Sequence, residues 1–97
     1  MNLTEIIARL DSADDSLCIV ARRPWAPGAE AKLIALTDEY RVPVEVLADG
    51  YEYFLEVSLA VDDVIGDLRS LTVGQKVEAC IFYAENDAYP DWLTRLR

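Results

Sequence analysis

The sequence contains no histidine and only two cysteines among its 97 residues. Histidine is the commonest general base and metal ligand, so its absence removes the most frequent routes to acid–base and metal-assisted catalysis. Cys18 and Cys80 lie far apart in the chain, each inside an apolar run, and they form neither a CxxC motif nor a disulfide framework. We predict that both are reduced, buried thiols acting as small core hydrophobes. We also predict a protein that is not an enzyme and has no metal or cofactor.

Glycine is equally scarce, with four scattered residues, and no glycine-rich phosphate-binding loop or GxSxG motif occurs. Aspartates cluster twice, at Asp11, Asp14 and Asp15 and at Asp62, Asp63 and Asp67. Neither cluster has the spacing of a calcium-binding EF-hand loop. We interpret the first as a polar turn and the second as the N-terminal turn of a helix.

Long apolar runs and basic residues are also few. No run approaches the ~20 residues that span a bilayer, and residues 1–5 lack the basic start of a secretory signal, so we predict a cytoplasmic protein. Nine Lys and Arg oppose 18 Asp and Glu, which leaves a net charge of −9. Nucleic acids and anionic membranes are polyanions, so this charge argues against both and is compatible with a basic protein partner.

Capping signals and apolar spacing predict the helices. Thr72, with Gln75 three residues later, forms a capping box for the longest one, which Asn86 can close and Pro90 prevents from continuing. A first short helix begins at Asn2 or Thr4, a further helix spans about residues 59–71, and residues 91–97 form one last turn. In the helix over 59–71 the apolar stripe consists of Val61, Val64, Ile65 and Leu68.

Short runs between turn signals predict the strands, at residues 17–21, 31–36 and 51–57. A helix is the alternative for 31–36, and residues 44–48 are either a strand or irregular. In 51–57 alternation places Tyr51, Tyr53, Leu55 and Val57 on the core face, and Glu52, Phe54 and Glu56 on the other. The chain is thus predicted to form a single domain over 1–97. Its fold class is α+β, with a small antiparallel sheet of about three to four strands and helices packed on one face.

Three groups of residues are candidates for binding. The first, Glu85, Asp87, Tyr89, Asp91 and Trp92, brings three acids and two aromatics into eight residues, a composition typical of interfaces. Alternatively its aromatics fold back onto the core while the acids face water. The second group is Arg22, Arg23 and Trp25, in a loop where an arginine either stacks on Trp25 or faces a partner. The third, Tyr51, Tyr53 and Phe54, lines an apolar pocket or is simply the packed face of the sheet.

Residues 83–89, Tyr-Ala-Glu-Asn-Asp-Ala-Tyr, resemble a motif in a family of short acidic bacterial proteins of unknown function. Members end their last helix with an aromatic followed by Asn-Asp-Ala-aromatic, open with a short helix, and have a Tyr-Glu-Tyr-like strand near the middle. The resemblance implies a small α+β fold and, for some members, an immunity protein beside a bacterial toxin. It implies no catalytic residues, and residues 22–28 are not part of the family pattern.

These observations lead to a hypothesis of a protein-binding domain, in its sharpest form an immunity-type inhibitor of a basic toxin. One alternative is a structural or regulatory subunit that forms a homodimer through a sheet edge. Another is a small-ligand-binding protein.

Overall fold

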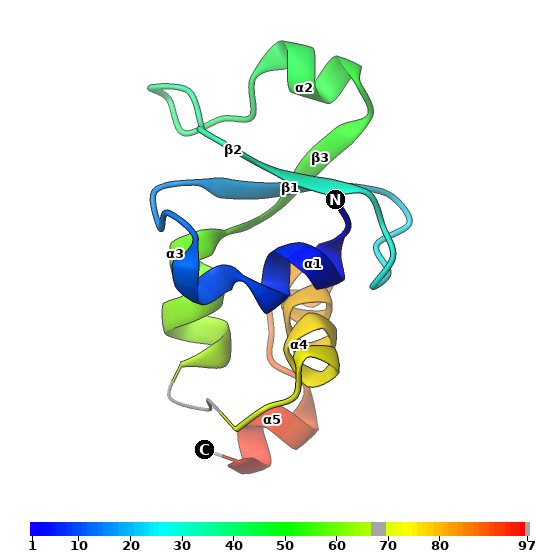
Figure 1. Ribbon diagram of the computed structural model, residues 1–97, viewed down its shortest axis with the longest axis vertical. Helices are drawn as coiled ribbons and strands as arrows, with labels where there is room; N and C mark the ends of the chain where they lie inside the picture. Colours follow the sequence, from blue (N-terminus) through cyan, green and yellow to red (C-terminus); the bar gives the residue numbers. More distant parts are fainter. Residues whose placement is uncertain (67–69, 97) are drawn as a thin grey trace.

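The computed structural model describes residues 1–66 and 70–96 and arranges them around a three-stranded antiparallel sheet (Figure 1). The strands are β1 (Cys18–Arg22), β2 (Ala31–Ile34) and β3 (Tyr51–Glu56), in the order β2-β1-β3. The predicted α+β class is therefore confirmed. The segment predicted over 31–36 is a strand, as preferred, although it ends two residues earlier.

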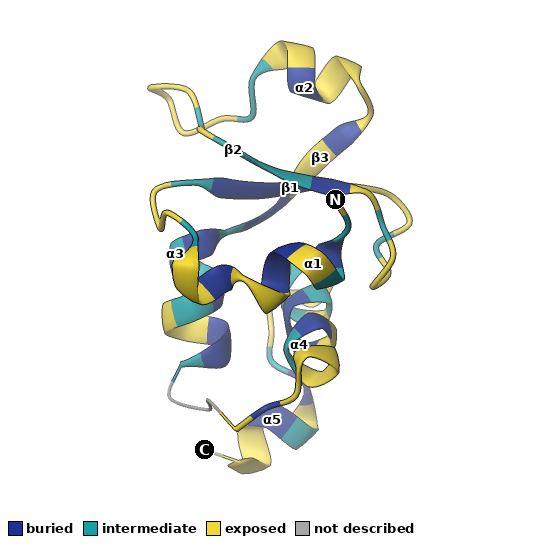
Figure 2. Ribbon diagram, in the orientation of Figure 1, coloured by how far each residue is buried: buried dark blue, intermediate teal, exposed yellow. Residues whose placement is uncertain are grey.

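Most helices lie below the sheet in Figure 1 and bury its lower face. They are α1 (Leu3–Ala8), the 3-10 turn η1 (Leu10–Ser12), α3 (Val57–Leu59), the π-helical segment η2 (Ala60–Ile65), α4 (Val73–Asn86) and α5 (Asp91–Leu96). Alternate residues of β1 point to opposite faces of the sheet. Ile19 and Ala21 pack in the main core with the helices, whereas Cys18 and Val20 pack in a small cluster on the other face. Both cysteines are buried and free, which confirms their predicted state. Strand β1 is buried over nearly its whole length (Figure 2).

The upper face of the sheet is covered by α2 (Val44–Ala48), a segment for which we predicted a strand or irregular structure. Val46 of α2 packs with Cys18, Val20 and Tyr51. Pro43 precedes the helix with a φ of −55°, and a proline at a helix start loses no hydrogen bond and presets the backbone for the first turn. That signal and the burial of Val46 outweigh the strand preference of its valines. Helices therefore cover parts of both faces, not one.

A β-bulge in β3 makes the predicted division of its two faces wrong. Ile19 pairs with Leu55 but Val20 pairs with Tyr53, so Phe54 is an extra residue without an opposite partner. A bulge shifts the alternation by one residue. Phe54 is therefore only 1% exposed and joins the main core beside Leu55, whereas Tyr53, predicted to be in the core, is 41% exposed.

The helix predicted over 59–71 begins earlier and ends earlier. Helical turns run from Val57 to Ile65, and Gly66 follows with a φ of 57°, a conformation that glycine adopts without a Cβ penalty. The predicted positions Asp67 and Leu68 lie outside the described residues. Because the helical run begins at Val57, Asp62 and Asp63 lie in its second turn, although they are in the first turn of η2, so the predicted N-terminal position is wrong.

Capping boxes begin both α1 and α4. Asn2, rather than Thr4, caps α1 and exchanges hydrogen bonds with Glu5. Thr72 Oγ1 accepts a hydrogen bond from the Gln75 amide at 3.1 Å, and the Gln75 side chain accepts one from the Thr72 amide at 2.9 Å. The predicted start of α4 is thus confirmed.

Replacing Thr72 with alanine is expected to lower the free energy of unfolding by about 1 kcal/mol, because the first turn of α4 loses its side-chain acceptor. Urea denaturation followed by circular dichroism measures this loss. Thr72→Ser is the matched control, since it keeps the hydroxyl and should stay close to the parent protein. Equal losses in the two variants would show that the hydroxyl does not stabilise α4.

Candidate functional site

Helix α4 turns one side into the core and leaves the other beside the loop that follows β1. Val77 is buried in the main core. On the other side, Gly74, Glu78, Phe82 and Glu85 recur three or four residues apart, so they share one side of the helix. Phe82 is 38% exposed, a large apolar ring on a side that is otherwise polar or small.

The loop facing α4 is held in place through Trp25. The Trp25 ring meets the Phe54 ring edge-on, with 5.1 Å between ring centroids and 81° between ring planes. Its indole N–H donates to the Ala21 carbonyl at 3.4 Å. The Arg23 guanidinium lies 3.8 Å from the centre of the Trp25 ring, and Arg23 also lies 3.2 Å from the Glu52 carboxylate. Trp25 is therefore fixed by contacts to a strand end, a core ring and a cation.

The far end of the same loop is attached to α1. The amide and hydroxyl of Thr4 both donate to the Pro27 carbonyl, at 3.1 and 2.9 Å. The Leu3 amide donates to the Ala29 carbonyl at 3.0 Å. These hydrogen bonds keep residues 25–27 at a set distance from the helices below the sheet.

Between residues 25–27 and α4 lies a hollow of about 460 Å³, called the α4 groove below. Its lining residues are Trp25, Ala26, Pro27, Gly74, Glu78, Ile81, Phe82, Glu85 and Asn86. Trp25, Pro27, Ile81 and Phe82 make it largely apolar. The exposed side chains of Glu78 and Glu85 stand along it, two helical turns apart. An apolar groove with acids beside it suits a ligand that is both apolar and cationic.

The five predicted partner-binding residues, Glu85, Asp87, Tyr89, Asp91 and Trp92, run from the end of α4 into α5. The three carboxylate residues are exposed. Tyr89 and Trp92 are half-buried and pack against the main core, and the Tyr89 ring centroid lies 5.3 Å from that of Tyr83. The acids therefore face solvent while the aromatics partly fold back onto the core, as in the alternative considered from the sequence.

Glu85 and Asp87 line different hollows. Asp87 ends α4 in a left-handed conformation with a φ of 52°, and its amide donates to the Tyr83 carbonyl at 2.8 Å. It lines a hollow of about 290 Å³ together with Tyr53, Leu59 and Tyr83. Burial first, and the Asp87 charge second, raise the pKa of the Tyr83 hydroxyl. Acidic side chains at the end of α4 therefore border two hollows, Glu85 the α4 groove and Asp87 the hollow of 290 Å³.

The arginines of the second candidate group have partners within the molecule. Arg22 lies 3.1 Å from Glu30 and 4.6 Å from the centre of the Tyr51 ring. Arg23 stacks on Trp25, the intramolecular arrangement considered from the sequence. Both arginines remain about half exposed, and the same loop also contributes Trp25 and Pro27 to the α4 groove.

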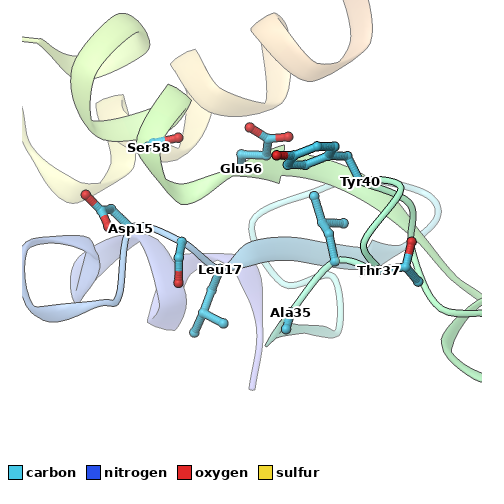
Figure 3. A pocket seen from close by; sticks show the side chains of 9 residues that line it. Asp15, Leu17, Ala35, Thr37, Tyr40, Glu56 and Ser58 are labelled. Atoms are coloured by element: carbon cyan, nitrogen blue, oxygen red, sulfur yellow. The ribbon is translucent and has the colours of Figure 1, made fainter.

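Of the third candidate group, Tyr53 and Phe54 line the 290 Å³ hollow, whereas Tyr51 packs with Val46 on the upper side of the sheet. A separate hollow of about 320 Å³ lies beside the end of β3 (Figure 3). Its lining includes the carboxylates of Asp15 and Glu56 and the ring of Tyr40, which is 82% exposed. A small ligand could occupy this hollow, where two carboxylates and a phenol are available for hydrogen bonds.

The nucleophilic and acidic groups elsewhere are held in unreactive surroundings. Burial raises the pKa of the Cys80 thiol to about 12; burial and, second, the Glu56 charge do the same for Cys18. Both thiols are therefore protonated at pH 7. Hydrogen bonds from the Ser16 hydroxyl and amide lower the pKa of Asp14, which is part of a polar turn, as interpreted. Within the described ranges no group of three or more His, Cys, Asp or Glu could hold a metal ion.

The sequence reasoning missed Glu78, Ile81, Phe82 and Pro27 as surface residues. Ile81 and Phe82 belong to the apolar run of residues 77–84, which by itself favours burial. The available signal was the spacing of Glu78 and Glu85, seven residues apart with two apolar residues midway. This spacing places two acids and an aromatic on the same side of a helix.

Comparison of the chain with protein-family models, curated proteins and solved structures gave no match. The resemblance of residues 83–89 therefore stays a prediction. In the part of the chain that the structure describes, no helix has the length and apolar character needed to cross a membrane.

Proposed function

We propose that this chain is a non-enzymatic domain that binds a basic protein in the cytoplasm. One observation supports this most: Glu85, Asp87 and Asp91, which follow one another from the end of α4 to the start of α5, are all exposed. Among residues 1–66 and 70–96, no lysine or arginine forms an ion pair with any of the three. The arginines of the neighbouring loop are paired with Glu30 and Glu52 instead.

The three acids lie within residues 85–91, and like charges repel, so the free protein gains no electrostatic stability from grouping them. A basic partner relieves the repulsion and is also drawn to the surface from a distance. The net charge of −9 acts in the same direction over the whole molecule. Steering of this kind speeds encounter and selects partners by the sign of their charge.

The sharpest version of the proposal is an immunity-type inhibitor of a basic toxin, which rests on the resemblance of residues 83–89. A homodimer is favoured by one observation, the position of β3 at an edge of the sheet with only β1 beside it among the described strands. Two copies that each carry a charge of −9 repel one another, which makes a basic partner the better candidate.

The proposal predicts that replacing Asp87 and Asp91 with asparagine slows association with the partner several-fold at low salt, because exposed charges act mainly on the association rate. Affinity capture from the native cell first identifies the partner. Stopped-flow measurements with the purified partner then give the rate across ionic strength. The difference from the parent protein should shrink as salt rises, since the Debye length falls from about 30 Å at 0.01 M to about 8 Å at 0.15 M.

The matched control is Asp38→Asn with Glu39→Gln, which removes two exposed charges from the turn before α2, on the other side of the sheet (Figure 1). This control removes as much negative charge from the molecule as Asp87→Asn with Asp91→Asn does, but it should slow association less than that variant. Equal rates for all three proteins at every salt concentration would rule out the end of α4 as the binding surface. Analytical ultracentrifugation of the protein alone tests the homodimer separately.

A further inference from the structure

The α4 groove contains an aromatic ring that is partly exposed to solvent, although large apolar side chains are ordinarily buried in a folded domain. Phe82 is 38% exposed near the middle of a 14-residue helix, and Ile81, Trp25 and Pro27 adjoin it in the groove. Large apolar side chains gathered in a hollow and bordered by charge are typical of protein-binding surfaces.

The groove is also held open before any partner arrives. Trp25 is fixed by Phe54, Arg23 and the Ala21 carbonyl, and residue 27 is tied to α1 through Thr4. Gly74 contributes no side chain at one end, so the groove is not filled from α4. A preformed site loses little conformational entropy on binding, which raises the affinity that a given contact area can provide.

The charges along the groove select the ligand. Glu78 and Glu85 are both exposed and both line it. The cations near in sequence are directed elsewhere: Lys76 lines a hollow with Asp11 and Val61, and Arg23 pairs with Glu52. The groove is therefore apolar and net negative, which excludes an acidic ligand and favours a cationic one.

The spacing of these residues matches a helix. Along α4 the order is acid, two apolar residues, acid, at positions 78, 81, 82 and 85. Seven residues correspond to about 10 Å along a helix axis. A partner helix presents the complementary side when lysine or arginine stands seven residues apart with apolar residues at the third and fourth positions between them. Because the pattern is symmetric, it serves either direction of the partner helix.

We propose that the α4 groove binds a basic amphipathic helix of the partner protein. Two apolar side chains enter the groove against Trp25 and Phe82, and two cationic side chains flank them and pair with Glu78 and Glu85. This is the helix-in-groove mode of recognition. The inference rests on the proposed function, since it names the part of the basic partner that this domain binds.

The test uses a capped synthetic peptide of 15 residues with two lysines seven apart and leucines at the third and fourth positions between them. Isothermal titration calorimetry with the full chain should give a dissociation constant on the order of 10 μM at low salt. A peptide with glutamate in place of both lysines should not bind measurably. A peptide of the same composition with its leucines moved to the opposite side of the helix should bind at least about tenfold more weakly.

Three variants of the protein locate the binding site. Phe82→Ala removes the exposed ring, and Gly74→Leu fills the groove without removing any of its residues; each should weaken peptide binding about tenfold or more. Glu78→Gln with Glu85→Gln should weaken binding about tenfold and reduce its salt dependence. Val44→Ala, at an exposed apolar residue of α2 on the opposite side of the sheet, is the matched control and should bind as the parent does.

The outcomes separate this inference from the proposed function. Suppose that binding depends on the acidic residues but is as tight to Phe82→Ala and Gly74→Leu as to the parent protein. The α4 groove would then not be the binding site, whereas the acidic surface would still be supported. Absence of peptide binding to the parent protein would also overturn the groove. A different result would contradict the proposed function: an association rate with the partner that is the same for the parent protein and for Asp87→Asn with Asp91→Asn at every salt concentration. Unchanged unfolding midpoints show that each variant is folded.

Discussion

Replacing Phe54 with alanine is expected to lower the free energy of unfolding by roughly 3–5 kcal/mol. Phe54 is 1% exposed and packs edge-on against Trp25, so the truncation leaves a cavity in the main core and removes a neighbour of that ring. A domain of this size is stable by only about 5–15 kcal/mol. The variant should therefore be close to unfolding at room temperature, which urea denaturation measures directly.

Tyr53→Ala is the matched comparison, because it truncates an aromatic ring at the next position of the same strand. Tyr53 is 41% exposed, so we expect a loss of roughly 1 kcal/mol or less. The ratio between the two losses is a test of the bulge, since regular alternation would bury Tyr53 and expose Phe54. A larger loss for Tyr53→Ala than for Phe54→Ala would contradict the register of β3.

The second large effect is a loss of stability in alkali caused by the two buried thiols. In the folded protein the pKa values of Cys18 and Cys80 are raised to about 12, from an ordinary value of 9.0. Between these values the folded protein keeps both protons and the unfolded chain releases them. Unfolding then releases protons, so the free energy of unfolding falls as the pH rises. The stabilising contribution of the protonated thiols is complete below the unfolded pKa of about 9 and is lost progressively as the pH rises toward the folded pKa of about 12.

Two thiols should together lower the free energy of unfolding by about 3 kcal/mol between pH 8 and pH 10, since one pKa unit corresponds to about 1.4 kcal/mol. Urea denaturation across this range provides the measurement. Cys18→Ala with Cys80→Ala should start less stable, because it leaves small cavities, but should decline less steeply. An equally steep decline without the thiols would assign the effect to other groups.

The same burial should protect both thiols from modification at pH 8. A reagent that reacts with the thiolate reaches them only after the protein opens, so labelling in native buffer should be slower than in denaturant by roughly three orders of magnitude. Rapid labelling of one thiol under native conditions would place that cysteine at the surface and weaken the argument from alkaline instability.

Local signals account for the elements that the sequence predicted correctly. Thr72 and Gln75 satisfy each other's backbone groups within one turn, so the start of α4 needs no information from the rest of the fold. Cys18 belongs to a short apolar run that is rich in β-branched residues and bounded by turn signals, which favours a buried strand. Asp87 lies where α4 ends, one residue beyond Asn86.

The wrong predictions concern residues whose state depends on a distant partner. The bulge at Phe54 is a matter of how β3 pairs with β1, and the alternating pattern of residues 51–57 contains no trace of it. Val46 is buried in a helix because Cys18, Val20 and Tyr51 leave an apolar area on the upper face of the sheet. The valines of that segment favour a strand when considered alone.

The amino-acid composition and local pattern were enough to establish the α+β class, the buried thiols, the start of α4 and a strong negative charge. Each of these depends on residues close in the chain or on the chain as a whole. The α4 groove required the folded structure, because its walls come from residues 25–27 and 74–86. The docking of Trp25 on Phe54, at a bulge that no local pattern predicts, and the hydrogen bonds from Thr4 to Pro27 bring these walls together.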